Sequence, residues 1–515
     1  MTALHPGEAP VSHLGRSREA LPCPSGCASR CLDWLAVSVT VAPGRPLALS
    51  APARARLTRH VIEGIAQARR SGRPVLVAVT DELDPSVDPC AVAFASRESE
   101  EPYFCLEQPD RGGAALSALG TAATLEAHGP SRFRVVADRW RDLVSDARAD
   151  DPGRAPGTGL VAVGGFAFAP EGGASEAWSG FAAASLHVPQ VALARRDGQV
   201  HVTLATRVAG DDLADQVVAA MQARLGRLRR RPLPLLDPEP LARRRVGGAL
   251  APEHYEAAVA RAAERIRAGD LEKVVLAREV SVHAGADLDA AAVFGVLRDA
   301  FASCFTFCVG RGPAAFLAAS PELLIRREGM RVSTLALAGS TRRSADPAVD
   351  DHLGEALLRS DKDRGEQAIV TRRIERTLRE DAVWVAAAPE PVLVRVANIQ
   401  HLATPIRAQL AVPVGVIELL GRLHPTPAVG GEPWAVAEAL IPALEGMDRG
   451  WYAGPVGWVD AVEDGEFCVA LRCALLRGRE ARCYAGVGVV ADSDPEAELA
   501  ETETKLAALL PVLAG

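Results

Sequence analysis

The most informative stretch of the chain is Asp494-Pro495-Glu496-Ala497-Glu498-Leu499-Ala500-Glu501-Thr502-Glu503-Thr504-Lys505, which follows a strand-like, glycine-containing run from Tyr484 to Val490. Pro495 suits the first position of a helix and Asp494 suits its N-cap. An apolar stripe at helical spacing continues from this start and consists of Leu499, Leu506, Leu510 and Leu513. The sequence therefore predicts a strand followed by a helix at the end of the chain.

A second stripe on this helix carries charge. Glu498, Glu501 and Lys505 stand at positions i, i+3 and i+7. Two carboxylates on one face can bind a hard divalent cation such as Mg2+ through oxygen, and a nearby lysine can hold a substrate carboxylate. The same spacing fits a solvated face, because Glu501 and Lys505 form the favoured i to i+4 helix pair. Spacing alone leaves both interpretations open.

Composition indicates an ordinary globular protein. The chain has 515 residues, of which 48% are apolar and 24% charged, and its net charge is -8. A chain of this length and composition can bury a large core. Its arginine clusters are offset by acidic residues, so we expect no nucleic-acid partner.

The sequence predicts neither a membrane span nor a secretory signal. Its longest apolar runs, Gly159 to Ala169 and Val469 to Leu476, fall well short of the roughly 20 residues that cross a bilayer. The N-terminus lacks a basic region followed by an apolar core, so we expect a cytoplasmic location. Cysteines in apolar context are expected to be core residues, and those near the N-terminus thiols of a flexible tail. The first group is Cys304, Cys308, Cys468 and Cys473, and the second is Cys23, Cys27 and Cys31.

The pattern of apolar runs and turns divides the chain into three regions. Residues 1–32 are expected to form a disordered leader. Residues 33–245 are predicted to form an antiparallel sheet with a few helices, ending in an exposed connector from Arg227 to Arg245. Residues 246–515 open with a predicted helix from about His254 to Ala268 and hold nearly all the chemically suggestive residues. The apolar runs of the second region are Leu35 to Val41, Val75 to Val79, Phe133 to Val136, Leu160 to Phe168, Val191 to Ala194 and Val200 to Ala205.

Lys273 lies in a strand-like segment, Leu271 to Arg278. Alternation puts its side chain on one face with Leu271, Val275 and Ala277. A lysine among apolar neighbours loses solvation, which disfavours its charged form and suits a general base. The alternative is a lysine that reaches water at the strand entrance.

Glu322 stands between two apolar runs in Ala318 to Ile325. If it is enclosed, its pKa rises, so that it could hold a proton at neutral pH and deliver it to a leaving hydroxyl. An ordinary turn glutamate is an equal alternative.

Two further segments have both a functional and a structural interpretation. Leu337 to Arg343 contains Gly339 and Ser340, whose backbone N–H groups could face an anion from a tight turn, although a hairpin with a basic rim is commoner. The segment from Ser360 begins a long amphipathic helix to Leu378, on which Glu366 could be a third metal-binding carboxylate or part of a solvated charge run.

Arg472 lies in Phe467 to Ala474, where strand alternation groups it with Cys468, Ala470 and Ala474. These small neighbours leave room beside the guanidinium. A buried arginine needs a partner, and a carboxylate is the usual one. The sequence leaves open whether that carboxylate belongs to a ligand or to the protein.

A series of short motifs runs in order from about residue 250 to 515. They are Gly269-Asp270, Lys273 to Arg278, Ser320 to Glu322, Leu337 to Ser340, Lys362 to Glu366, His401 to Pro405, His424 to Ala428, Met447 to Gly450, Gly457-Trp458, Arg472 to Ala474, Ala485 to Gly488 and Glu501-Thr502. In this order they resemble the chorismate-utilising enzymes, which include anthranilate, salicylate and isochorismate synthases. The resemblance implies an α+β fold with a single large domain, in which two packed antiparallel β-sheets are flanked by helices.

The resemblance also implies which nucleophile attacks. Family members that use ammonia typically carry glutamine where this chain has Lys273, so water is the expected nucleophile. The sequence motifs around His401 and from His424 to Ala428 resemble those of isochorismate synthases. Salicylate synthases share the lysine at position 273 but diverge at these two motifs. The chain departs from the family pattern at Gly365 and Gln367, where histidines are frequent.

By resemblance, the chain converts chorismate reversibly to isochorismate with Mg2+. Lys273 would deprotonate a water that adds at ring carbon 2, and Glu322 would protonate the hydroxyl that leaves carbon 4. The implied metal ligands are Glu366, Glu498 and Glu501. The implied substrate-binding residues are Gly339, Ser340, His401, Ala428, Arg472, Gly486 and Lys505. We expect a monomer that needs no glutaminase subunit. A salicylate synthase and a catalytically inactive regulatory member remain alternatives.

Overall fold

The computed structural model describes residues 46–150, 155–236 and 244–514. From Arg45 onward the chain belongs to one compact unit. The leader expected at residues 1–32 and the strand expected from Leu35 to Val41 lie outside the described residues. The boundary expected at residue 245 remains a prediction.

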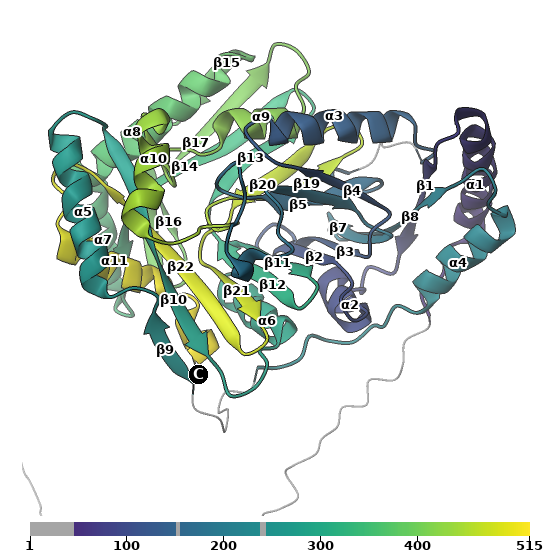
Figure 1. The fold of residues 1–515 in the computed structure, drawn as a ribbon, viewed down its shortest axis with the longest axis horizontal. Coiled ribbons are helices and arrows are strands. Elements are labelled where there is room, and N and C mark those ends of the chain that lie inside the picture. Colours follow the sequence, from purple (N-terminus) through teal and green to yellow (C-terminus); the bar gives the residue numbers. More distant parts are fainter. Residues whose placement is uncertain (1–45, 151–154, 237–243, 515) are drawn as a thin grey trace, which may run out of the picture. The chain divides into compact units, whose positions relative to one another are not determined.

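Two large sheets dominate the fold (Figure 1). Within the described ranges, the larger sheet has twelve strands. Its strands follow one another in space as β1 (Val75–Leu83), β8 (Gln199–Val208), β7 (Val191–Arg196), β3 (Ala114–Leu119), β2 (Tyr103–Gln108), β11 (Phe305–Arg311), β12 (Ala314–Ser320), β21 (Cys473–Arg477), β22 (Glu480–Val489), β10 (Lys273–His283) and β18 (Gly431–Glu432), with β9 (Arg245–Gly248) also paired to β10.

The smaller sheet has ten strands in the same described ranges. Its order is β15 (Ala382–Ala387), β17 (Ile399–Leu410), β14 (Arg331–Arg342), β13 (Leu323–Glu328), β20 (Gly465–Val469), β19 (Pro455–Asp460), β5 (Val161–Phe166), β6 (Ala184–Val188) and β4 (Ala123–Ala127), with β16 (Val392–Arg395) also paired to β17. Neighbouring strands run antiparallel in both sheets. The fold class expected from the resemblance is therefore confirmed.

Helices pack around both sheets. The outer face of the larger sheet carries α1 (Ala51–Ser71), α2 (Pro89–Ser96), α4 (Ala214–Gly226), α6 (Ala290–Ala300) and α12 (Leu510–Ala514). The end formed by β10 and β22 carries α5 (Pro252–Arg267), α10 (Trp434–Glu445) and α11 (Pro495–Leu506), and the smaller sheet carries α3 (Arg132–Ser145), α7 (Pro347–Arg359), α8 (Asp361–Leu378) and α9 (Val416–Leu423). A short 3-10 turn, η1, spans Glu176–Trp178.

Strand alternation explains why the strands of the larger sheet are apolar on both faces. In β1, Val75, Val77 and Val79 join the core under the outer helices, whereas Leu76 and Ala78 join the core between the sheets. Side chains of successive residues point to opposite faces of a sheet, so a strand buried on both sides needs an unbroken apolar run.

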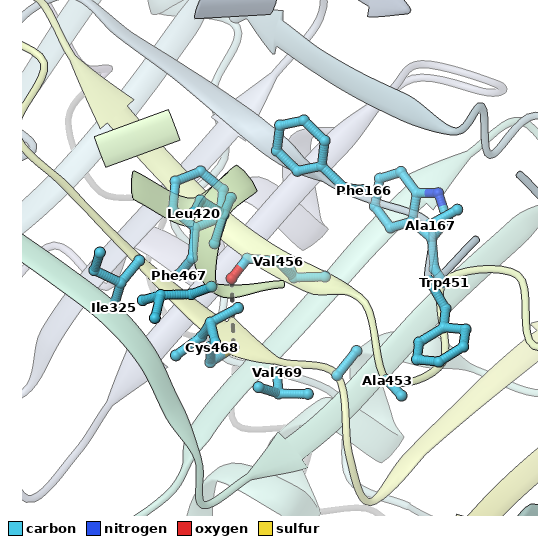
Figure 2. Packing of buried hydrophobic residues seen from close by; sticks show 14 of the residues in the cluster. Phe166, Ala167, Ile325, Leu420, Trp451, Ala453, Val456, Phe467, Cys468 and Val469 are labelled. Carbon is cyan, nitrogen blue, oxygen red and sulfur yellow. Dashed lines mark hydrogen bonds between the residues drawn. The ribbon is translucent and has the colours of Figure 1, made fainter. Parts of the chain in front are cut away.

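The core between the sheets is closely packed around Phe467 (Figure 2). Phe467 and Ile325 are fully buried and lie opposite each other where β13 pairs with β20. The Cys468 thiol donates a hydrogen bond to the Val456 carbonyl oxygen at 3.4 Å. The cysteines expected in the core, including Cys304 and Cys473, are buried and unbridged.

Most of the expected elements that lie in the described residues are confirmed. The strands expected at Val75 to Val79, Leu160 to Phe168, Val191 to Ala194 and Val200 to Ala205 are found in β1, β5, β7 and β8. The helix expected from about His254 is α5, and the long helix expected after Ser360 is α8. Phe133 to Val136 was expected to be a strand, and this prediction is wrong, because it lies in α3. A four-residue apolar run fits either structure, and Trp140, buried one turn further along the same helix, supplies the helical period.

Two of the places where the chain crosses between the sheets lie side by side in the C-terminal half. Ser320-Pro321-Glu322 leads from β12 in the larger sheet to β13 in the smaller one. Ala470-Leu471-Arg472 leads back from β20 in the smaller sheet to β21 in the larger one. The two crossings are bonded together, because the Val469 N–H donates to the Glu322 carbonyl oxygen and the Ala319 N–H donates to the Arg472 carbonyl oxygen.

None of the helices in the described part of the chain has the length and apolar character that crossing a membrane requires.

Candidate active site

A pocket of about 580 Å3, part of it open to solvent, lies beside these crossings. Strands of both sheets, the two crossings and two helices contribute to its wall. Of the residues expected at the site, those that line it are Glu322, Gly339, Ser340, Glu366, His401, Ala428, Arg472, Gly486, Glu501 and Lys505. Lys273 and Glu498 lie directly behind this wall. Lys273 contacts Glu366, and Glu498 contacts Lys362.

Lys273 begins β10 and is completely buried. The alternative in which it reaches water is therefore wrong. Its Nζ lies 2.8 Å from Oε1 of Glu366, which α8 directs toward the strand. The pair fits only because position 488 in β22 is glycine: a Cβ there would lie 2.1 Å from Glu366 Oε1 and 2.7 Å from Lys273 Cε.

Glu322 is 3% exposed and lies at the first crossing. Burial raises the pKa of its carboxyl to about 8, against the opposing charges of Arg472, Lys273 and Lys505. The group is therefore mainly protonated at neutral pH and can act as an acid.

Arg472 lies at the second crossing, where its backbone has φ of 49°. The sequence placed it within a continuous strand, and this prediction is wrong, because the strand ends at Val469 and the next begins at Cys473 in the other sheet. Its Nη2 donates to Nε2 of His401 at 2.7 Å. Among the described residues, Arg472 forms no ion pair with a carboxylate, and its buried Nε has no hydrogen-bond partner. The protein itself therefore does not supply the carboxylate that this guanidinium favours.

His401 is held in one tautomer by its two neighbours. Because arginine can only donate, Nε2 accepts from Arg472, so the proton resides on Nδ1, which donates to the Gly339 carbonyl oxygen at 3.3 Å. Burial, with Arg472 and Lys505 nearby, holds the pKa of His401 well below its ordinary value. The ring is neutral, and it orients Arg472.

Gly339 lies in a β-bulge within β14. The pairing with β17 skips it, passing from Ala338 opposite Leu402 to Ser340 opposite His401, and its φ is 73°. The tight turn and the hairpin considered from the sequence are thus both wrong. The bulge turns Ser340 toward α11, where its hydroxyl donates to Glu501 Oε1 at 2.6 Å.

The last helix has the start that the sequence predicts. The Asp494 side chain caps α11 by accepting from the Ala497 N–H, and Pro495 is its first residue. The apolar stripe is divided, because α11 ends at Leu506 and Leu510 begins α12.

The charged stripe of α11 faces the protein and not solvent. Glu498 is 1% exposed, so the solvated interpretation is wrong for it. Lys505 Nζ lies 2.8 Å from Glu501 and donates to the Gly486 carbonyl oxygen at 2.9 Å. Burial opposes it, but Lys505, the Ser340 hydroxyl and Lys362 together lower the pKa of Glu501.

Lys362, in the first turn of α8, completes this cluster. Its Nζ donates to Glu498 Oε1 at 2.7 Å. Burial on its own lowers the pKa of Lys362, but the hydrogen bond to Glu498 and the charges of Glu498, Glu501 and Glu366 raise it. All three carboxylates expected to bind metal therefore act on one ammonium group.

The donor set fits a cation. Among the described residues, no three histidine, cysteine, aspartate or glutamate side chains already converge as a metal site. The three carboxylates are nevertheless the hard oxygen donors that Mg2+ prefers, and the Lys362 ammonium is a stand-in cation among them.

The sequence did not single out every residue of the pocket. Tyr452, Leu471 and Tyr484 also line it, and the rings of Tyr452 and Tyr484 stack at 5.3 Å between centroids. Gly486 is needed beside them, because a Cβ there would lie 2.7 Å from the Tyr452 hydroxyl. An apolar or aromatic side chain carries no local signal that separates a pocket wall from a core.

Comparisons with known proteins identify the family. A family model described as chorismate binding enzyme matches residues 63–514, and the chain belongs to this family. A relative from Pseudomonas aeruginosa, named salicylate biosynthesis isochorismate synthase, is 40% identical over 468 residues, which are 88% of this chain and 95% of the relative.

Solved structures agree with the family. MenF, the menaquinone-specific isochorismate synthase from Escherichia coli, has a TM-score of 0.70 and 27% identity, with 89% of this chain and 100% of that chain covered. Anthranilate synthase component I from Streptococcus pneumoniae shares the fold, with a TM-score of 0.59 and 20% identity over 81% of this chain and 91% of that one.

Proposed function

We propose that this chain is an isochorismate synthase, which converts chorismate reversibly to isochorismate by adding water at ring carbon 2 and releasing the hydroxyl of carbon 4. The observation that carries the proposal is a fully buried lysine close to a buried carboxyl that holds a proton at neutral pH. The names of the P. aeruginosa relative and of the E. coli structure support the same activity.

Two proton transfers account for the reaction. Lys273 takes a proton from the attacking water, and Glu322 donates its proton to the oxygen that leaves carbon 4. In the reverse direction the two groups exchange roles. A positioned acid or base typically contributes 10²–10⁴-fold each, and a pKa near the working pH suits Glu322 to both directions.

Charge in the pocket selects the substrate. Chorismate carries two carboxylates, and Arg472 offers a buried Nε without a protein partner. Lys505 and the backbone at Gly339, Ser340 and Gly486 lie along the same wall. We propose that these groups hold the substrate carboxylates, with His401 orienting Arg472.

The proposal includes Mg2+. Glu366, Glu498 and Glu501 would hold it, and when bound it would neutralise a substrate carboxylate and fix its orientation. Because water is the nucleophile, no glutaminase subunit is required. We further propose that the protein acts as a monomer in the cytoplasm, and size-exclusion chromatography tests the monomeric state.

A product assay tests the function. Purified protein is incubated with chorismate and MgCl2, and the products are separated by chromatography and identified by mass. Isochorismate is the expected product. Salicylate plus pyruvate would instead identify a salicylate synthase, and no turnover would identify an inactive member. The variants Lys273→Ala and Glu322→Gln should each abolish turnover while keeping the native circular dichroism spectrum; normal turnover by either would overturn the mechanism.

A further inference from the structure

Lys362 lies where its charge is unfavourable for the helix that carries it. It is the second residue of α8, after the N-cap Ser360. The N-terminus of a helix carries a partial positive charge, which repels a cation in the first turn. A contact outside the helix holds this ammonium group.

The three carboxylates of the proposed metal site hold it. Lys362 Nζ bonds to Glu498 Oε1 at 2.7 Å, and it also lies in the field of Glu366 and Glu501. Glu366 and Glu501 have lysines of their own at 2.8 Å, Lys273 and Lys505. For Glu498, Lys362 is the only ion-pair partner that the described residues provide.

We propose that Lys362 is an internal counter-cation, which neutralises the carboxylate cluster in the metal-free protein and which a divalent cation displaces when it binds. The lysine can leave, because its side chain is 38% exposed whereas Glu498 is nearly inaccessible to water. Metal binding is then an exchange of one cation for another. This inference rests on the metal site in the proposed function.

The contact between Lys362 and Glu498 opposes metal binding and stabilises the metal-free protein. Without a cation, Glu498 would be a buried and unpaired carboxylate beside Glu501, and such a group is strongly destabilising. Lys362 prevents this situation, but a metal ion must break its hydrogen bond to bind. A hydrogen bond between charged partners is worth about tenfold or more in an equilibrium constant.

The test compares wild type, Lys362→Met and Arg359→Met by calorimetric titration of the metal-free protein with MgCl2. Arg359 is a matched control, because it ends α7 just before α8, its side chain is 77% exposed, and its loss changes the net charge equally. We expect Lys362→Met to lower the Kd for Mg2+ about tenfold and Arg359→Met to leave it unchanged.

Thermal unfolding provides a second readout. Metal-free Lys362→Met should have a lower Tm than wild type, and saturating MgCl2 should remove the difference. A merely structural lysine would lower Tm with and without Mg2+ and would not tighten binding.

Equal or weaker Mg2+ binding by Lys362→Met overturns the inference, and isochorismate formation by the wild type would then leave the proposed function intact. If neither protein binds Mg2+ while chorismate is still converted, both the metal site and the inference are wrong and the isomerase activity stands. Binding by the variant alone would support the inference.

Discussion

Gly488→Ala should uncouple Lys273 from Glu366 without altering either residue. The new Cβ would lie 2.1 Å from Glu366 Oε1 and 2.7 Å from Lys273 Cε, so the carboxylate must retreat by about 1 Å to reach an ordinary contact. The backbone of Gly488 is not in the left-handed region, so alanine does not strain the backbone there. A misplacement of this size at a reacting group costs on the order of 10²-fold in rate, or about 2.7 kcal/mol in activation free energy.

The assay is kcat and kcat/KM for isochorismate formation at saturating MgCl2. Gly365→Ala is the matched control, because Gly365 precedes Glu366 in α8 and a Cβ there would meet nothing within 4 Å. The control should keep its rate and gain about 0.5–1 kcal/mol of stability, since alanine favours a helix more than glycine does.

Stability separates the catalytic effect of Gly488→Ala from unfolding. Overpacking a core costs typically about 1–3 kcal/mol, which a folded protein of this size tolerates, so the variant should unfold cooperatively in urea. If folded Gly488→Ala keeps kcat within threefold of wild type, the contact between Lys273 and Glu366 does not matter for turnover and the reasoning is refuted.

Three further predictions follow from buried charge. Glu322→Gln should be inactive yet more stable than wild type by up to about 3 kcal/mol at pH 7, because a folded-state pKa of about 8, raised from 4.5, costs the wild type stability as pH rises from 4.5 to 8; urea unfolding at pH 5 and pH 8 should show a much larger gap at the higher pH. Arg472→Lys should raise the KM for chorismate on the order of 100-fold with a smaller effect on kcat. Lysine cannot replace the planar guanidinium, whose Nη2 bonds His401 while Nε remains available to a carboxylate. An unchanged KM would place the substrate carboxylate elsewhere. Glu445→Gln should destabilise the fold by about 3 kcal/mol, because it leaves the buried Arg449 guanidinium without its anion; a loss below 1 kcal/mol in urea unfolding would contradict this.

The sequence predicted the helix starts that depend on interactions between neighbouring residues. The start of α11 could be read from Asp494 and Pro495, because capping and the fixed φ of proline act within one turn. The helix after Ser360 was predictable for the same reason. The apolar run in α3 was misread because four residues do not establish a period.

The burial of charged residues was not predictable from local pattern. The local pattern left open whether Lys273 reaches water and whether the charged stripe of α11 is solvated, yet Lys273 and Glu498 are almost completely buried. Only the family resemblance pointed the other way, because the partners of these residues lie in distant segments. Glu366 is 93 positions from Lys273 along the chain, and Lys362 is 136 positions from Glu498.

Arg472 shows most clearly why a local pattern fails at this site. Its segment alternates like a strand on both sides, but the chain leaves one sheet and enters the other at this residue, with a positive φ that an arginine rarely adopts. Such a conformation costs on the order of 1–3 kcal/mol and persists only where the surroundings enforce it. Here the second crossing enforces it, through the hydrogen bond from Ala319 to the Arg472 carbonyl oxygen.

The two crossings explain why the site lies where it does. In a strand interior every second side chain points into a core, whereas at a crossing the chain leaves the sheet and its side chains are no longer bound to this alternation. At the crossings the strands end, and Glu322 and Arg472 face one pocket while the sheets around them stay closed. Val469 ties the crossings together by donating to the Glu322 carbonyl oxygen and by accepting from the Ser320 hydroxyl at 2.5 Å. The acid is thus fixed by backbone contacts, which leaves its carboxyl free for the substrate. This arrangement requires both sheets, so a change that separates them should abolish activity even where every catalytic side chain is retained.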